Sequence, residues 1–196
     1  MLSGSYSYIG VKKEMEKKIK VPFEDGQLEQ LKAGDYVHLS GTIYTARDAA
    51  HKRMHESMQK GEELPISLDG NILYYLGPSP ARDEQVIGSA GPTTSSRMDK
   101  YTPDMLAAGL KGMVGKGKRS QDVIDAMKKH KAVYFAAVGG AGALLSKCIK
   151  EAEVVAYEDL GTEAIHRLAI EDLPVIVVID CQGNNLYESA PDNWKR

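Results

Sequence analysis

The stretch Ala132-Val-Tyr-Phe-Ala-Ala-Val138, with Gly139-Gly-Ala-Gly142 directly after it, decides the fold class of this 196-residue chain. The first seven residues form a continuous apolar run, which predicts a buried strand. The glycine-rich segment predicts a turn. After this turn we expect a helix over residues 143–153 and another strand over 154–157. A strand, a helix and a second strand in succession are typical of an α/β domain.

The segments on both sides of this stretch extend the alternation. On the N-terminal side, Thr102-Pro103-Asp104 has the residue types of a helix start and predicts a helix over 105–111. The other elements expected in the second half are a strand at 113–114, helices over 121–129 and 162–171, a strand over 175–179, a turn over 181–185 and a returning segment at 186–187.

The first half of the chain is richer in strand-like runs. We expect strands at 36–39, 42–45, 72–75 and 86–89, a hairpin turn at Leu68-Asp-Gly-Asn71 and a helix over about 47–60. Residues 1–17 are interpreted as a weakly ordered lead-in, with Met15 as an alternative start. Residues 18–196 are interpreted as a single domain.

The composition excludes several classes of protein. A formal net charge of −2 provides no overall field for binding nucleic acid or an anionic membrane. No run approaches the roughly 18–20 apolar residues of a membrane span, and the first residues lack the apolar core of a signal peptide. Two cysteines, Cys148 and Cys181, favour a reducing, cytoplasmic compartment. They are too few to hold an iron–sulfur cluster, so we expect no metal site in this chain.

Arg47 is the first candidate site residue, in the segment Thr45-Ala-Arg-Asp-Ala-Ala-His51. A guanidinium beside the free N–H groups of a helix start suits a carboxylate ligand. A surface arginine paired with Asp48 is the alternative. His51 and His55 would share a helical face, but without a third ligand a packed or solvated pair is favoured over a metal site.

The second candidate segment is Gly91-Pro-Thr-Thr-Ser-Ser-Arg97. The hydroxyls of Thr93 and Thr94 can orient a ligand, and the planar fork of Arg97 can bind a carboxylate through two nitrogens. A capped helix start is an equally good interpretation of such a segment.

The third candidate segment is Val114-Gly-Lys-Gly-Lys-Arg119. Glycines on both sides of Lys116 allow the backbone to approach a ligand closely, although such a segment is more often a solvated basic turn. It is not a Walker A loop, which has a different spacing. Taken together, Arg47, Arg97 and Lys116 suit a small dianion, which needs two separate cationic contacts.

Four motifs together resemble class I fumarate hydratase, specifically its C-terminal domain or separate beta subunit, which is shared with the L-tartrate dehydratase beta subunit. The motifs are Gly41-Thr-Ile-Tyr-Thr-Ala-Arg-Asp-Ala-Ala-His51, Gly91-Pro-Thr-Thr-Ser-Ser-Arg-Met98, Gly115-Lys-Gly-Lys-Arg-Ser120 and Ala136-Ala-Val-Gly-Gly-Ala-Gly142. The later Tyr157-Glu-Asp-Leu-Gly161 and Val178-Ile-Asp-Cys-Gln-Gly183 also fit. The resemblance covers about residues 18–187.

The resemblance implies a swivelling β/β/α domain with a mixed sheet and flanking helices. It also implies a [4Fe–4S] cluster that three cysteines of a partner alpha subunit hold, and whose open iron acts as a Lewis acid. In this chain Arg47, Thr93, Thr94, Arg97 and Lys116 would bind the substrate, and Thr93 would also move the proton on carbon. Because a free threonine hydroxyl is too weak a base near neutral pH, Thr93 would need an aspartate of the partner.

The implied activity is the reversible hydration of fumarate to (S)-malate, with dehydration of L(+)-tartrate to oxaloacetate as the alternative. We expect this polypeptide to be inactive without the alpha subunit. We also expect the two subunits to form a hetero-oligomer, with a homodimer of the isolated chain as the alternative. Gly140-Ala-Gly-Ala-Leu-Leu145, with Glu158 further on, nearly matches a dinucleotide-binding fingerprint, but Leu145 stands at the third glycine position. A non-catalytic interaction module is a further alternative, against which the presence of Arg47, Thr93 and Arg97 argues.

Overall fold

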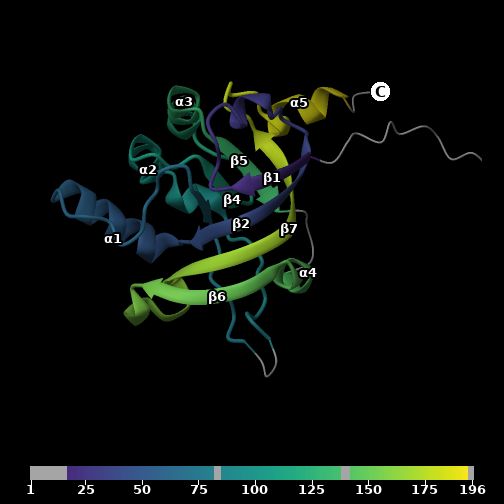
Figure 1. Ribbon diagram of the computed structural model, residues 1–196. Coiled ribbons are helices and arrows are strands. Elements are labelled where there is room, and N and C mark those ends of the chain that lie inside the picture. Colours follow the sequence, from purple (N-terminus) through teal and green to yellow (C-terminus); the bar gives the residue numbers. More distant parts are fainter. Residues whose placement is uncertain (1–16, 82–84, 138–141, 194–196) are drawn as a thin grey trace, which may run out of the picture.

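The computed structural model describes residues 17–81, 85–137 and 142–193 (Figure 1). The strands are β1 (Lys17–Val21), β2 (Tyr36–Thr45), β3 (Ile72–Tyr74), β4 (Gly112–Gly115), β5 (Val133–Ala137), β6 (Ile149–Ala156) and β7 (Ile165–Ile179). The helices are α1 (Asp48–Gln59), α2 (Thr102–Ala107), α3 (Gln121–His130), α4 (Gly142–Lys147) and α5 (Leu186–Asn193). Short 3-10 helices are η1 (Leu28–Gln30), η2 (Ser95–Met98) and η3 (Glu158–Glu163).

Five of the strands close into a barrel. β2, β3, β4 and β5 run parallel to one another in this order. β7 pairs antiparallel with both β2 and β5: one of its edges pairs with β2 from Arg167 to Ile176, and its other edge pairs with β5 from Val175 to Ile179. β1 adds to β2 in parallel and β6 adds to β7 in antiparallel orientation. The result is the mixed sheet with flanking helices that the resemblance implies.

Alternate side chains of the strands contribute to two hydrophobic cores. In β3, Ile72 and Tyr74 belong to the core between the strands, whereas Leu73 packs with the helices. In β5, Phe135 belongs to the first core and Tyr134 to the second. Such alternation follows from the two-residue repeat of a strand. α1, α2 and α3 lie together on one side of the barrel and cover the second core (Figure 1).

Several predicted elements are confirmed. α1 and α3 match the helices expected over 47–60 and 121–129 to within one residue at each end. The strands expected at 36–39 and 42–45 join into one strand, β2, whose pairing with β7 shifts register between Leu39 and Gly41. Gly41 has a φ of 127°, and a Cβ there would lie 2.1 Å from the Val21 carbonyl oxygen of β1. The glycine interruption therefore marks a bulge and a close strand contact.

Two helix predictions are wrong. Residues 143–153 are helical only as far as Lys147, and Ile149–Ala156 forms β6. Residues 162–171 lie mostly in β7, not in a helix. β6 and β7 pair from Ile149 with Ile170 to Ala156 with Ile165. This pairing overrides the helix-favouring alanine, glutamate and leucine content of both segments, because intrinsic propensity is a weak term.

The remaining corrections concern short segments. Leu68 and Asn71 do form a turn, but no hairpin follows because β3 runs parallel to both of its neighbours. Residues 86–88 are bends and not a strand, and residues 186–187 begin α5. The helix predicted over 105–111 starts three residues earlier, at Thr102, and ends four residues earlier, at Ala107. Lys17, which we expected in the lead-in, belongs to β1. Residues 1–16 lie outside the described residues, as do residues 139–141 of the turn predicted at 139–142, whose last residue, Gly142, begins α4.

No helix in the described part of the chain has both the length and the apolar character that crossing a bilayer requires.

Candidate functional site

The parallel strands β2, β3 and β4 end at the same level of the barrel. Their register pairs Thr45 of β2 with Tyr74 of β3, and Tyr74 with Val114 of β4. Since the three strands run in the same direction, the segments that follow them emerge at one end, the carboxyl end of the strands. Ligands of α/β proteins bind at this end of the sheet.

The residues predicted for the site follow these strand ends. Arg47 comes two residues after β2, and Lys116 comes directly after β4. The threonine segment returns to the end of β3, because the Thr93 amide donates to the Tyr75 carbonyl oxygen at 2.8 Å. Thr94 then forms a parallel bridge with Lys116. The structure therefore brings the threonine segment and Lys116 together as backbone neighbours.

Arg47 is held in a defined orientation at the N-cap position of α1. Its side chain is 22% exposed, and Nη2 lies 3.4 Å from Glu163 Oε1 and 3.6 Å from Asp48 Oδ2. A Cβ on Gly77 would lie 2.8 Å from Arg47 Cδ, so the arginine stem passes closely over this glycine. The pairing with Asp48 that the sequence suggested thus exists, and Glu163 joins it. Arg47 Nε is buried without a hydrogen-bond acceptor in the ranges described.

Thr93, Thr94 and Arg97 have side chains that bond to no other residue of the described ranges. Thr93 is half-buried, and Thr94 and Arg97 are exposed; Arg97 lies in η2, just beyond the bridge to Lys116. Within residues 17–81, 85–137 and 142–193, none of these side chains takes part in a hydrogen bond or ion pair. Two hydroxyls and a guanidinium are therefore available to a ligand.

A ring of hydrogen bonds fixes the backbone of Lys116. Its amide donates to Ser95 Oγ at 3.1 Å, and its carbonyl oxygen accepts from the Ser95 amide at 2.9 Å. Ser95 Oγ lies 2.9 Å from the Tyr134 hydroxyl, which donates to the Gly117 carbonyl oxygen at 2.9 Å. Burial raises the pKa of Tyr134, so the phenol keeps the proton that it donates. Lys116 thus has a fixed backbone and an exposed ammonium.

Arg119 and Asp99 form a largely buried ion pair beside these residues, and neither is predicted as a site residue from the sequence. The Arg119 side chain is fully buried, and its Nε donates to Asp99 Oδ1 at 2.7 Å. The other Asp99 oxygen accepts from the Ser120 amide at 2.7 Å, and Arg119 Nη2 donates to Thr102 Oγ1 at 2.8 Å. No pattern in the sequence distinguishes this buried arginine from the exposed Lys116 and Lys118 beside it.

His51 and His55 are packed and paired, as favoured from the sequence. His51 is buried edge-on against Tyr75, and its Nδ1 lies 2.9 Å from the Arg47 carbonyl oxygen. Burial lowers the pKa of His51 to about 4, so the ring is neutral near neutral pH. His55 Nδ1 lies 3.0 Å from an oxygen of Asp104. His51 therefore supports the backbone of Arg47.

The described residues do not fit an iron–sulfur cluster. Cys148 is half-buried with its sulfur 3.8 Å from the Asp172 carbonyl oxygen, and Cys181 is buried with its sulfur 3.7 Å from the Leu28 carbonyl oxygen. In the part of the chain that the structure describes, no group of three or more histidine, cysteine, aspartate or glutamate side chains is arranged to hold a metal ion. The ligands of any cluster would therefore have to come from outside these residues.

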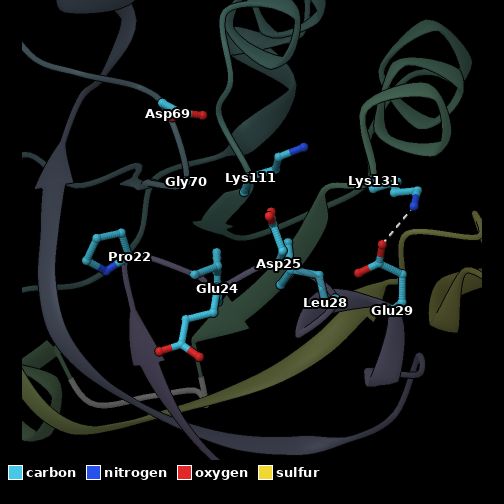
Figure 2. A pocket seen from close by; sticks show the side chains of 11 residues that line it. Pro22, Glu24, Asp25, Leu28, Glu29, Asp69, Gly70, Lys111 and Lys131 are labelled. Atoms are coloured by element: carbon cyan, nitrogen blue, oxygen red, sulfur yellow. Dashed lines mark hydrogen bonds and ion pairs between the residues drawn. The ribbon is translucent and has the colours of Figure 1, made fainter.

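A cavity of about 410 Å³ lies at the opposite end of the barrel (Figure 2). Gly70, Lys111 and Lys131, which precede β3, β4 and β5, line it together with residues that follow β1. Its lysines already have protein partners: Lys131 pairs with Glu29 at 2.9 Å, and Lys111 donates to the His130 carbonyl oxygen at 2.6 Å. None of the predicted site residues borders this cavity.

The dinucleotide-binding alternative lacks the strand arrangement that it requires. A dinucleotide fingerprint joins two parallel strands through a helix. Here α4 is followed by β6, which pairs antiparallel with β7 and not with β5. Glu158 lies in η3 beyond that strand. The expected βαβ unit is therefore not formed by β5, α4 and β6.

The geometry defines a class of protein: an α/β barrel domain that presents cations and threonine hydroxyls at the carboxyl end of its parallel strands, as suits a small anionic ligand. The chain belongs to the family described as Fumarase C-terminus, whose model matches residues 7–190. This match confirms the resemblance that the four sequence motifs indicate.

Named relatives agree with this family. The chain is 40% identical over 164 residues to "Fumarate hydratase class I, aerobic" of Escherichia coli (strain K12), which covers 83% of this chain and 30% of that protein. It is 40% identical over 166 residues to "Fumarate hydratase 2" of Leishmania major, and this match covers 84% of this chain and 29% of that protein. It is 37% identical over 169 residues to "Putative L(+)-tartrate dehydratase subunit beta" of Methanocaldococcus jannaschii, and this match covers 83% of this chain and 87% of that protein. The chain thus spans less than a third of these fumarate hydratases and most of the tartrate dehydratase subunit.

Proposed function

We propose that this chain supplies the carboxylate-binding part of an active site that reversibly adds water to fumarate to give (S)-malate. The backbone bridge between Thr94 and Lys116 carries the proposal, because it places the threonine segment beside an exposed ammonium without an ionic partner in the described ranges. Arg97 and Arg47 add two guanidinium groups at the same end of the barrel. Separate cations of this kind match the two carboxylates of a small dicarboxylate. The fumarate hydratases among the relatives support this substrate.

We propose that Thr93 both orients the substrate and moves the proton on carbon. In the dehydration direction, the C–H bond beside one carboxylate breaks, its electrons form the double bond, and the hydroxyl leaves from the neighbouring carbon. A threonine hydroxyl is too weak a base for this step on its own, so a carboxylate of a partner subunit must accept the proton from it. The Thr93 side chain is half-buried and has no hydrogen-bond partner in the described ranges, so its hydroxyl is available for such a contact.

We propose that a [4Fe–4S] cluster on an alpha subunit supplies the Lewis acid for departure of the hydroxyl. The tartrate dehydratase beta subunit, 87% of which this chain covers, supports an arrangement in which the cluster-bearing part is a separate polypeptide. In such a hetero-oligomer this domain would swivel over the partner to close the site. The isolated chain would then be inactive. We place the complex in a reducing, cytoplasmic compartment.

L(+)-tartrate dehydratase is the second candidate, and the same subunit favours it. Tartrate and malate differ by one hydroxyl, and both present two carboxylates to the cations. Either activity is tested by anaerobic co-expression with a cluster-bearing alpha subunit, followed by assays of fumarate hydration and tartrate dehydration on one sample. Turnover of one substrate would assign the activity. An assembled, cluster-loaded complex that turns over neither substrate would contradict the proposal.

A further inference from the structure

The charge of Arg119 is fully enclosed by its own chain. Its side chain is 0% exposed, and its donors pair with Asp99 at 2.7 Å and with Thr102 at 2.8 Å. The guanidinium also lies 5.4 Å from the Tyr75 ring centre and 5.1 Å from that of Tyr134. Enclosing a charge is costly, and a buried ion pair is often no more stabilising than apolar packing. A purely structural need is therefore a weak reason for an arginine here.

The contacts of Arg119 join the two segments that carry the predicted ligand groups. Asp99 directly follows η2, which contains Arg97, and binds both the Arg119 side chain and the Ser120 amide. Arg119 itself lies three residues after Lys116. Tyr75, under the guanidinium, holds the Thr93 amide through its carbonyl oxygen. The Arg119 guanidinium thus contacts Tyr75, which is hydrogen-bonded to Thr93, and Asp99, which lies two residues after Arg97. Arg119 itself belongs to the segment of Lys116.

We propose that Arg119 is a positioning residue for dicarboxylate binding: it holds the threonine segment and the Lys116 segment at a fixed separation. This proposal rests on the proposed function, since it assigns the support of the same ligand groups. The planar guanidinium is required because its nitrogens bind Asp99 and Thr102 in two directions at once, which a lysine ammonium at the same place cannot do. The Ser95–Tyr134 hydrogen bonds fix Lys116 locally, whereas Arg119 links its segment to Asp99.

The test compares Arg119→Lys and Arg119→Ala with the unchanged chain in the assembled, cluster-loaded complex. We expect KM for the dicarboxylate to rise roughly tenfold or more, because small displacements of binding groups are costly to catalysis. Lower stability alone would reduce the amount of active complex, and hence the apparent kcat, without changing KM. Guanidinium ion at millimolar concentration should restore KM of Arg119→Ala towards that of the unchanged chain, whereas sodium chloride at equal ionic strength should not. Arg167→Lys, in the surface pair of Arg167 with Glu153, is the control, with KM unchanged.

Hydrogen exchange separates this proposal from the proposed function. In the full chain alone, Arg119→Lys should speed amide exchange at both residues 93–97 and 115–118, whatever the substrate. If the unchanged complex turns over neither fumarate nor tartrate, the proposed function fails, and faster exchange at both segments still supports the coupling. Unchanged exchange overturns the positioning role. So does a folded, active Arg119→Lys complex with unchanged KM.

Discussion

The Glu163 carboxylate contacts both the Arg47 side chain and the first turn of α1. One oxygen lies 3.4 Å from Arg47 Nη2, and the other accepts a hydrogen bond from the Ala49 amide at 2.9 Å. A carboxylate at a helix N-terminus is favoured by the helix dipole, so Glu163 is anchored independently of Arg47. The glutamate is therefore a fixed ionic partner of the Arg47 guanidinium.

Replacing Glu163 with glutamine should weaken substrate binding more than it weakens the fold. The amide oxygen of Glu163→Gln can still accept from Ala49, but the negative charge beside Arg47 is lost. The guanidinium is then no longer held by an ionic partner on that side, and we expect the loss of this positioning, worth about 1 kcal/mol for a partly exposed ion pair, to raise KM roughly fivefold. Steady-state kinetics of the assembled complex would measure it. Asp159→Asn, which removes the surface pair with Arg53 from the same segment, is the control; an equal rise in both variants would contradict a specific role of Glu163.

Glu163 also shows where prediction from sequence ends. The motif around Arg47 identifies a cation at a strand end, and the structure places it there. Its partner Glu163 stands in a segment for which residue content predicts a helix, whereas long-range pairing with β6 makes the following residues a strand. The position of Glu163 next to Arg47 depends on that pairing, which no local pattern contains.

The sequence likewise predicts the location of the exposed cations Arg97 and Lys116 but not the burial of Arg119. Arg97 and Lys116 stand in glycine- and hydroxyl-rich segments, and such segments emerge at strand ends, so their location follows from local sequence. The burial of Arg119 depends on distant side chains, those of Asp99, Thr102, Tyr75 and Tyr134. Residue type alone predicts an exposed arginine there, because arginine is rarely buried unless it is paired.

The planar fork of Arg97 should matter for binding and not for stability. Arg97 is exposed and has no ion-pair partner in the described ranges, so Arg97→Lys leaves the free energy of unfolding unchanged within about 0.5 kcal/mol. It loses the two-nitrogen contact with a carboxylate, and we expect KM to rise roughly tenfold. Substrate titrations of the complex and urea unfolding of the chain measure the two quantities. Unchanged KM would remove Arg97 from the site.

A methyl group on Gly77 should displace Arg47. The added Cβ would lie 2.8 Å from both Cδ and Nη1 of Arg47, and 3.0 Å from the Thr162 carbonyl oxygen. The backbone oxygen cannot move easily, so the flexible arginine moves, and Gly77→Ala should raise KM on the order of tenfold. A double-mutant cycle provides the control: in an Arg47→Ala background, Gly77→Ala should have little further effect. Additive effects would show that Gly77 acts through some other group.

The Tyr134 hydroxyl should stabilise the segment that carries Lys116. Tyr134→Phe keeps the buried ring but removes the hydroxyl that bonds Ser95 Oγ and the Gly117 carbonyl oxygen, while Ser95 Oγ still accepts from the Lys116 amide. The loss should cost about 1–2 kcal/mol of unfolding free energy. Amide exchange at Lys116 should become faster. Tyr74→Phe, which removes a buried hydroxyl bonded to the Ala90 carbonyl oxygen, should lower stability similarly without affecting Lys116. Equal exchange at Lys116 in both variants would contradict this role.

The buried His51 should make the stability of the protein fall in mild acid. Burial lowers its folded-state pKa from 6.5 to about 4, so between these pH values the unfolded state binds more protons than the folded state. Stability from the neutral ring is therefore complete above pH 6.5 and is lost as pH falls towards 4, by about 3 kcal/mol at most. Urea unfolding at pH 7 and pH 5 would measure this loss. His51→Gln should flatten the pH dependence over this window, whereas His55→Gln, on the same helix, tests for a general effect of losing an imidazole. If the unchanged chain and His51→Gln lose equal stability between pH 7 and pH 5, His51 is not the group responsible.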